Sequence, residues 1–136
     1  MRLANESWSV TLRRSSDVAY ARQVAMQAMT AIDASPIKRT KFVTAVSEIA
    51  RNAILYGNGG AMTFEVVGSG KLRRILAECV DRGPGIADVE QALKEGYTSG
   101  KGLGLGLSGA KRLVDRFEIA SAPGAGTRVT MECAAR

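Results

Sequence analysis

Four glycines occupy alternate positions in residues 99–107, and the residues that follow predict a helix over about residues 107–116. Glycine adopts positive φ and lets a ligand approach the backbone closely. A glycine-rich loop that leads into a helix directs free N–H groups and the positive end of the helix dipole at an anion. The stretch therefore predicts either a flexible loop or a loop that binds phosphate.

Two common phosphate-binding motifs do not fit this glycine run. The spacing from Gly104 to Gly109 matches the dinucleotide motif G-x-G-x-x-G, but that motif follows a buried strand, and the polar residues 94–99 give no strand signal. In a Walker P-loop, serine or threonine would follow Lys101, whereas Gly102 follows it here. The remaining interpretation is a glycine lid that closes over the phosphates of a nucleotide.

The length and composition limit the class of protein. With 136 residues the chain is large enough for one core, and residues 1–136 are expected to form a single domain. No apolar run approaches the roughly 18 residues that span a bilayer. The first residues lack the apolar segment of a signal peptide, so the sequence predicts a cytoplasmic protein without membrane contact.

The cysteines and the charge exclude further classes. Cys79 and Cys133 have no CxxC spacing and the chain contains no histidine, which argues against a zinc site and predicts two reduced thiols in the core. A net charge of +6 would suit an acidic partner. The basic residues are scattered, however, and aromatic residues make up 5% of the chain, so nucleic-acid binding is not expected.

The apolar patterns predict the element order βααββ(α)αββ. The predicted strands cover about residues 8–12, 62–67, 73–80, 117–122 and 127–133. The predicted helices cover about residues 16–32, 36–56, 88–94 and 107–116. This order favours an α+β fold, a two-layer sandwich in which helices cover one face of a mixed, mainly antiparallel sheet.

Glu48 and Asn52 are the first pair of candidate site residues. They lie four residues apart in the second predicted helix, so their side chains share a face that borders its apolar stripe. A carboxylate and a carboxamide are costly to bury there without partners. Mg²⁺, together with a water or hydroxyl to be activated, would supply such partners. A solvated glutamate and an ordinary helix asparagine are the alternative.

Two turns next to predicted strands supply further candidates. Asp81 ends a strand and is followed by Gly83 and Gly85, so its carboxylate could accept a hydrogen bond from the amino group of a base while the backbone leaves room. Thr127 follows Gly126 and brings a hydroxyl into the last strand. Taken alone, each pattern is typical of an ordinary turn.

Taken together and in this order, these segments resemble the N, G1, G2 and final threonine boxes of the GHKL (Bergerat-fold) ATPases. That superfamily includes gyrase, Hsp90, histidine kinases and MutL. The resemblance covers about residues 8–133, and its motifs are Glu48-x-x-x-Asn52, Asp81-x-Gly83-x-Gly85, the lid 100–106 and Gly126-Thr127. The small size is similar to that of the anti-sigma-factor serine kinases. Residues 47–56 and 96–113 resemble the stressosome switch kinases among them.

The resemblance implies ATP and Mg²⁺ as cofactors and a role for each motif residue. It implies Glu48 as the general base, Asn52 as the Mg²⁺ ligand, and Asp81 as the acceptor for the adenine amino group. The implied nucleotide-binding residues are Asn52, Asp81, Gly83, Gly85, Ile86, Gly100, Gly102, Leu103, Gly104, Leu105, Gly106 and Thr127. Lys101 is not dictated by the family pattern, and its contact with the β/γ-phosphates is our own hypothesis.

The resemblance also implies a function. It implies an ATP-dependent serine/threonine protein kinase that phosphorylates a STAS-domain scaffold or antagonist protein and then engages an effector such as a PP2C-type phosphatase. The alternatives are an anti-sigma factor that binds a sigma factor, and a nucleotide-dependent adaptor without kinase activity. The absence of histidine excludes autophosphorylation on histidine. Glu48 favours an active enzyme, because ATP binding alone would not require it.

Overall fold

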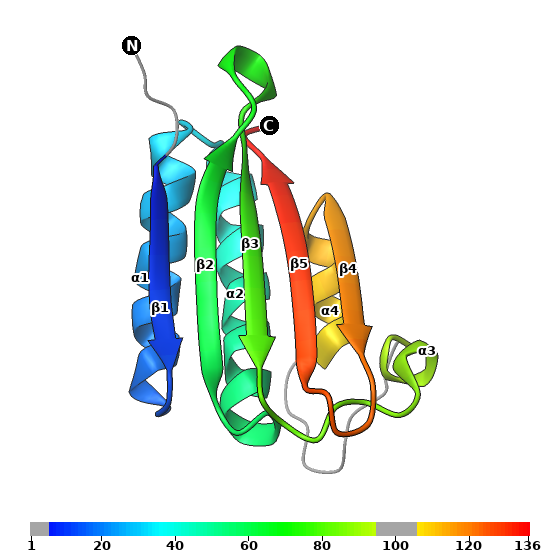
Figure 1. The fold of residues 1–136 in the computed structure, drawn as a ribbon. Coiled ribbons are helices and arrows are strands. Elements are labelled where there is room, and N and C mark those ends of the chain that lie inside the picture. The colour runs from blue at the N-terminus through cyan, green and yellow to red at the C-terminus, as the bar shows by residue number, and fades with distance from the viewer. Residues whose placement is uncertain (1–5, 95–105) are drawn as a thin grey trace.

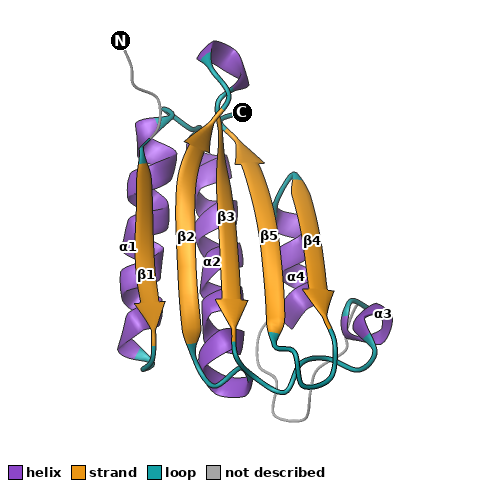
Figure 2. Ribbon diagram, viewed as in Figure 1, coloured by secondary structure: helices purple, strands orange, loops and turns teal. Residues whose placement is uncertain are grey.

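The computed structural model describes residues 6–94 and 106–136, which form a five-stranded sheet with helices against one face (Figures 1 and 2). The strands are β1 (Ser7–Leu12), β2 (Gly60–Val67), β3 (Arg74–Asp81), β4 (Arg116–Ser121) and β5 (Thr127–Ala134). The helices are α1 (Ser16–Ala31), α2 (Pro36–Tyr56), α3 (Val89–Ala92) and α4 (Gly106–Leu113), with a 3₁₀ turn at Gly70–Leu72. The predicted α+β sandwich is confirmed.

The sheet has the strand order β1-β2-β3-β5-β4, and each of these neighbouring pairs is antiparallel. The sequence predicts a mixed sheet with mainly antiparallel pairs, and no parallel pair occurs among the described strands. Asp81 lies opposite Thr127 in the β3–β5 register, and Thr127 lies opposite Ser121 in the β4–β5 register. Strand pairing therefore brings these three polar side chains to the same end of the sheet.

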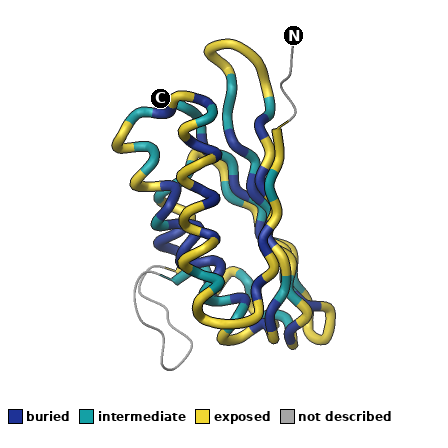
Figure 3. Tube along the Cα trace, turned by 90° about the vertical axis from the view of Figure 1, so that its left-hand side faces the viewer, coloured by how far each residue is buried: buried dark blue, intermediate teal, exposed yellow. Residues whose placement is uncertain are grey.

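The core lies between the sheet and the layer formed by α1, α2 and α4 (Figure 3). Alternate strand residues point into this layer, as the buried Met62, Phe64 and Val66 of β2 show. Phe42 of α2 meets Phe64 edge to face, with ring centroids 6.2 Å apart. The apolar stripe of α2 is buried and consists of Phe42, Ala45, Val46, Ile49 and Ala53.

The helix α2 begins and ends where its local sequence predicts. The Ser35 hydroxyl accepts a hydrogen bond from the Lys38 N–H at 3.3 Å, and Pro36 occupies the first turn, where its missing N–H costs nothing. At the other end, the Gly57 N–H donates to the Ala53 carbonyl at 3.0 Å. This 21-residue helix is the element that carries Glu48 and Asn52.

The expected end of the last helix is wrong by several residues. The sequence predicts a helix to Arg116, whereas α4 ends at Leu113 and Arg116 begins β4. Asp115 explains the difference, because its N–H donates to the Glu132 carbonyl of β5 at 3.0 Å. Its carboxylate accepts from the Ala134 N–H at 2.7 Å. A local pattern cannot show that a strand distant in sequence captures this residue.

Both cysteines are buried free thiols, as predicted. Burial, reinforced by the nearby Asp81 carboxylate, raises the pKa of Cys79 to about 12. Burial is also the main cause that raises the pKa of Cys133, to about 11. Both thiols are therefore protonated near neutral pH and serve as small apolar side chains. Among the described residues, no helix combines the length and hydropathy that crossing a bilayer requires.

We predict that Asp115→Asn destabilises the fold in a pH-dependent way. Partial burial acts to raise the pKa of Asp115, but hydrogen bonds from Lys38 Nζ and the Ala134 N–H outweigh it and lower the pKa below 3.8. A lowered carboxyl pKa stabilises the folded state above pH 3.8, and this contribution is lost as pH falls through the folded-state pKa. We expect a loss of roughly 1 kcal/mol at pH 7, because the group is half exposed.

Urea unfolding at neutral and acidic pH measures this effect. The matched control is Asp33→Asn, since the Asp33 carboxylate lies 3.8 Å from Arg136 and both side chains are well exposed. The control should change the free energy of unfolding very little at either pH. Equal losses in the two variants, or a loss for Asp115→Asn that does not shrink in acid, would contradict the interpretation.

Candidate functional site

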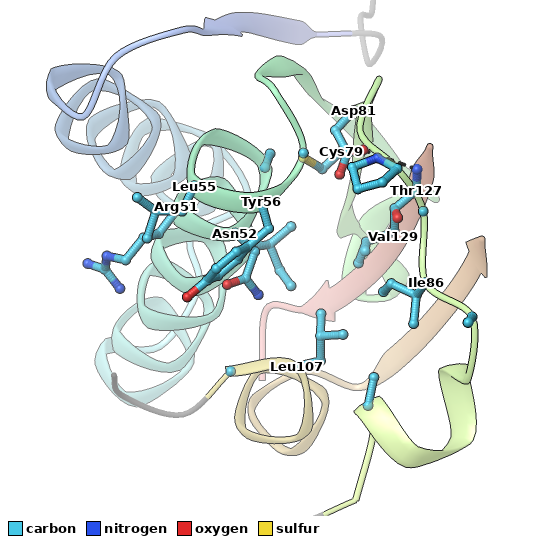
Figure 4. A pocket seen from close by; sticks show the side chains of 18 of the residues that line it. Arg51, Asn52, Leu55, Tyr56, Cys79, Asp81, Ile86, Leu107, Thr127 and Val129 are labelled. Carbon is cyan, nitrogen blue, oxygen red and sulfur yellow. Dashed lines mark hydrogen bonds between the residues drawn. The ribbon is translucent and has the colours of Figure 1, made fainter. Parts of the chain in front are cut away.

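A pocket of about 470 Å³ opens between the C-terminal half of α2, the ends of β3 and β5, and the start of α4 (Figure 4). This volume lies within the usual range for small-molecule sites. Its lining residues are Ile49, Arg51, Asn52, Ala53, Leu55, Tyr56, Gly57, Cys79, Asp81, Pro84, Gly85, Ile86, Ala87, Asp88, Gln91, Ala92, Gly106, Leu107, Thr127 and Val129. The predicted site residues in this lining are Asn52, Asp81, Gly85, Ile86, Gly106 and Thr127.

The two oxygens of the Asp81 carboxylate have different surroundings. Oδ1 accepts hydrogen bonds from the Gly83 N–H at 2.9 Å and the Thr127 N–H at 3.2 Å. Oδ2 lies beside Gly57 and receives no hydrogen bond from the residues that the structure describes. Since Gly57 also lines the pocket, the orientation of Asp81 leaves one charged acceptor available to a ligand.

The glycines around Asp81 allow backbone segments to pack closely. A Cβ at Gly57 would overlap the Asp81 carboxylate, and a Cβ at Gly83 would come within 2.9 Å of the Tyr56 carbonyl. Gly85 has a φ of +78°, and a Cβ there would overlap the Ala122 carbonyl. From the sequence, Gly83 and Gly85 are expected to allow the close approach of a nucleotide. The structure gives both a packing role within the protein, and their contact with a nucleotide stays a prediction.

Ser121 joins the segments that carry Ile86 and Thr127, a role that the sequence does not predict. Its Oγ accepts from the Ile86 N–H, donates to the Gly126 carbonyl, and lies beside Thr127 Oγ1, each at 2.8 Å. Ser121 itself is not part of the pocket lining. Its position opposite Thr127 arises from the strand register, which the sequence alone does not show.

Glu48 is buried next to the pocket rather than in its lining. Its side chain is 11% exposed. Oε2 accepts from Arg51 Nη1 at 3.0 Å, and Oε1 accepts from the Gly106 N–H at 3.2 Å. The carboxylate therefore connects α2 to the first residue of α4, where negative charge is favoured by the helix dipole. Gly106 also lines the pocket, so the Glu48 carboxylate lies close to it.

Asn52 points from α2 into the pocket, while Arg51 points away from it in Figure 4. The described residues form no hydrogen bond to the Asn52 carboxamide. They also contain no group of three or more Asp, Glu, Cys or His that could hold a metal. Mg²⁺ commonly keeps several waters and binds one or two protein oxygens together with substrate phosphates. Asn52 fits this kind of site, in which the ion arrives with a phosphate ligand.

Apolar side chains form the walls between the two polar ends of the pocket. Leu107 enters from α4, Ile86 from the segment after β3, and Val129 from β5 (Figure 4). Tyr56 lies at the end of α2 and is 40% exposed. Such walls suit a flat apolar ring held between a polar group at one end and a charged group at the other. Of these four residues, the sequence predicts Ile86 as a site residue but not Leu107, Val129 or Tyr56.

Part of the predicted lid cannot be placed. Gly100, Lys101, Gly102, Leu103, Gly104 and Leu105 lie outside the described residues. Gly106 is described, with a φ of +63°, and opens α4. The assignment of the other lid residues to phosphate binding therefore stays a prediction.

The fold and the pocket belong to a known class of protein. The sequence profile of the family described as "Histidine kinase-like ATPase domain" matches residues 12–133. The chain belongs to this family, which confirms the resemblance to the GHKL ATPases. One similar protein is the serine/threonine-protein kinase RsbT of Bacillus subtilis (strain 168), which is 35% identical over 127 residues, 92% of this chain and 94% of RsbT.

Further relatives support the same family. The anti-sigma F factor of Thermoanaerobacter sp. (strain X514) is 31% identical over 126 residues, 88% of this chain and 87% of that protein. The crystal structure of the RsbU and RsbW domains of Rv1364c from Mycobacterium tuberculosis matches with a TM-score of 0.67 and 20% identity. That match covers 95% of this chain and 32% of the other, so this chain spans about a third of the longer protein, and it shows the fold alone.

We predict that Gly57→Ala weakens nucleotide binding by roughly tenfold. The φ of Gly57 is −108°, which alanine adopts freely, so the added methyl acts through its overlap with the Asp81 side chain. Moving this carboxylate costs a hydrogen bond to a charged group, which is typically worth about 1.5–3 kcal/mol. Isothermal titration calorimetry with Mg-ATP measures the loss.

The control for this experiment is Gly70→Ala at the opposite end of the sheet. A Cβ at Gly70 meets no atom within 4 Å, but its φ of +56° makes alanine unfavourable. This control reports whether a loss of stability alone changes nucleotide affinity, and we expect it to bind as the unmodified protein does. Normal binding by Gly57→Ala would show that the position of Asp81 does not matter.

Proposed function

We propose that this protein is a cytoplasmic, ATP-dependent serine/threonine protein kinase whose substrate is a serine or threonine of a STAS-domain protein. The observation that carries the proposal is the pair of carboxylates at the pocket. Asp81 offers a free oxygen at one end, and Glu48 lies buried at the start of α4 near the other. Similarity to the kinase RsbT over 92% of the chain supports the same assignment.

The two ends of the pocket suggest how ATP lies in it. The free oxygen of Asp81 accepts a hydrogen bond from the adenine amino group, and Leu107 and Val129 contact the ring. The phosphates then extend toward Asn52 and the N-terminus of α4, where the helix dipole favours negative charge. Bound Mg²⁺ would neutralise phosphate charge, with Asn52 as its protein ligand. We assign residues 100–105 to the phosphates, with Lys101 at the β/γ-phosphates.

Glu48 takes the proton in the transfer step. The hydroxyl oxygen of the substrate attacks the γ-phosphorus, the bond from that phosphorus to the bridging oxygen breaks, and ADP leaves with the electron pair. The hydroxyl proton passes to Glu48. An ionised carboxylate has about four lone-pair sites, so Glu48 can accept this proton while it remains bonded to Arg51 and Gly106.

Phosphoryl transfer would also cause the protein to change its binding partner. The new phosphate carries about −1.5 to −2 charges and lies next to ADP in the same pocket mouth. Repulsion between the two anions favours release of the phosphorylated protein. The freed surface can then bind an effector such as a PP2C-type phosphatase in a stressosome-type pathway. The second candidate function is an anti-sigma factor, which the 31% identity to anti-sigma F factors favours.

We predict that Glu48→Gln retains nucleotide binding and loses most phosphoryl transfer. A missing general base typically costs about 10²–10⁴-fold in rate. Asn52→Ala should instead lose the part of the ATP affinity that depends on Mg²⁺, because its amide oxygen is the proposed ligand. Transfer of labelled phosphate to a cognate STAS-domain protein measures the first effect, and calorimetry with and without Mg²⁺ measures the second.

A mixture of the kinase and its cognate STAS-domain protein also tests the change of partner. The kinase and the STAS-domain protein should form a stable complex with a non-hydrolysable ATP analogue and separate with ATP, and mass spectrometry should find one phosphoserine or phosphothreonine. A normal transfer rate for Glu48→Gln would refute the base assignment. Capture of a sigma factor, with no phosphorylated protein after ATP, would favour the anti-sigma function.

A further inference from the structure

Among the described residues, Ser121 is the most fully hydrogen-bonded hydroxyl near the pocket, although it does not line the pocket. Three atoms lie 2.8 Å from its Oγ: the Ile86 nitrogen, the Gly126 carbonyl oxygen and Thr127 Oγ1. A serine hydroxyl has one proton to donate and two lone pairs that accept. These three neighbours therefore use all of its capacity, and the direction of each bond can be worked out.

The proton of Ser121 must go to the Gly126 carbonyl, because that oxygen cannot donate. The Ile86 N–H can only donate, so it takes one lone pair of Ser121 Oγ. If Ser121 instead donated to Thr127, its oxygen and the Gly126 oxygen would face each other at 2.8 Å without a proton between them. The remaining arrangement has the Thr127 hydroxyl donating to Ser121.

This arrangement fixes what Thr127 presents to the pocket. With its proton directed at Ser121, Thr127 Oγ1 offers only lone pairs to a ligand. The neighbouring Asp81 Oδ2 is also an acceptor. The N–H groups of Gly83 and Thr127 are both taken by Asp81 Oδ1, and that of Ile86 by Ser121. Among the described residues, this end of the pocket therefore presents hydrogen-bond acceptors to a ligand, while these three backbone N–H groups are already bonded within the protein.

We propose that Ser121 is a positioning residue that sets base specificity. By holding the Thr127 hydroxyl as an acceptor, it makes this end of the pocket bind a 6-amino purine, whose amino group donates, and disfavour a 6-oxo purine, whose oxygen accepts. The inference rests on the proposed function, namely that a purine nucleotide occupies the pocket. Because Ser121 acts through Thr127, its substitution should change the ratio of ATP to ITP affinity more than it changes the binding of the phosphate groups.

Calorimetric titration with Mg-ATP and Mg-ITP tests the proposal, since the two nucleotides differ at position 6 of the base and its adjacent ring nitrogen. The unmodified protein should prefer ATP. In Ser121→Ala the Thr127 hydroxyl can rotate and donate to the 6-oxo group, so the ratio of ATP to ITP affinity should narrow roughly five- to tenfold. Ser121→Thr keeps the hydroxyl and should restore the ratio.

The effect must disappear when Thr127 has no hydroxyl. In Thr127→Val, the additional change Ser121→Ala should leave the ATP-to-ITP ratio unchanged. Thermal unfolding checks the fold of each variant. If Ser121→Ala does not fold, Ser121→Cys replaces it, because a thiol of similar size is a weak donor and acceptor and should also narrow the ratio.

Several outcomes would overturn the proposal. An unchanged ratio in folded Ser121→Ala or Ser121→Cys, or equal losses of ATP and ITP affinity, would reduce Ser121 to a structural role. The same narrowing in the Thr127→Val background would show that Ser121 does not act through Thr127. If the unmodified protein binds ATP but the Ser121 variants do not narrow the ATP-to-ITP ratio, the proposed function still stands and only the role of Ser121 is refuted. If the unmodified protein binds neither nucleotide, the proposed function and the role of Ser121 are both refuted.

Discussion

A single carboxylate oxygen, Asp81 Oδ1, holds the end of β3, the turn after it and the start of β5 in one arrangement. It accepts the N–H groups of Gly83 and Thr127, and the absence of a side chain at Gly57 leaves space for the carboxylate. Because Oδ1 is occupied, the orientation of Oδ2 is fixed before a ligand binds. Binding then requires little reordering of this group, which is the advantage of a preorganised site.

The opposite end of the pocket depends on a second carboxylate, which is buried. Glu48 bonds to Arg51 within α2 and to the Gly106 N–H at the start of α4, so one side chain links α2 to the last residue of the predicted lid. Removing it would leave the Gly106 N–H and the Arg51 guanidinium without this partner. The same residue therefore contributes to structure and, in the proposed function, to chemistry, and Glu48→Gln is the more informative variant because it keeps the shape.

The sequence predicts best those features that local residues determine. The helix Pro36–Tyr56 was predicted at both ends, because its start and stop signals lie next to it. The sequence does not predict the end of α4, because Asp115 forms hydrogen bonds with a strand that is distant in sequence. The motif resemblance identified Asp81 and its neighbours as a site. It could not reveal Ser121 or the packing role of Gly57, because both arise from strand register and from distances between separate segments.

The most direct test of the account is the affinity of Asp81→Asn for Mg-ATP. The amide oxygen can keep both backbone hydrogen bonds of Oδ1, so the variant should unfold at the same temperature while its NH₂ group faces the base as a donor. We expect the affinity to fall by at least tenfold, since a hydrogen bond to a charged group is worth about 1.5–3 kcal/mol. Asp88→Asn, another pocket carboxylate that caps α3, should bind normally. Unchanged ATP affinity in a folded Asp81→Asn protein would contradict the account.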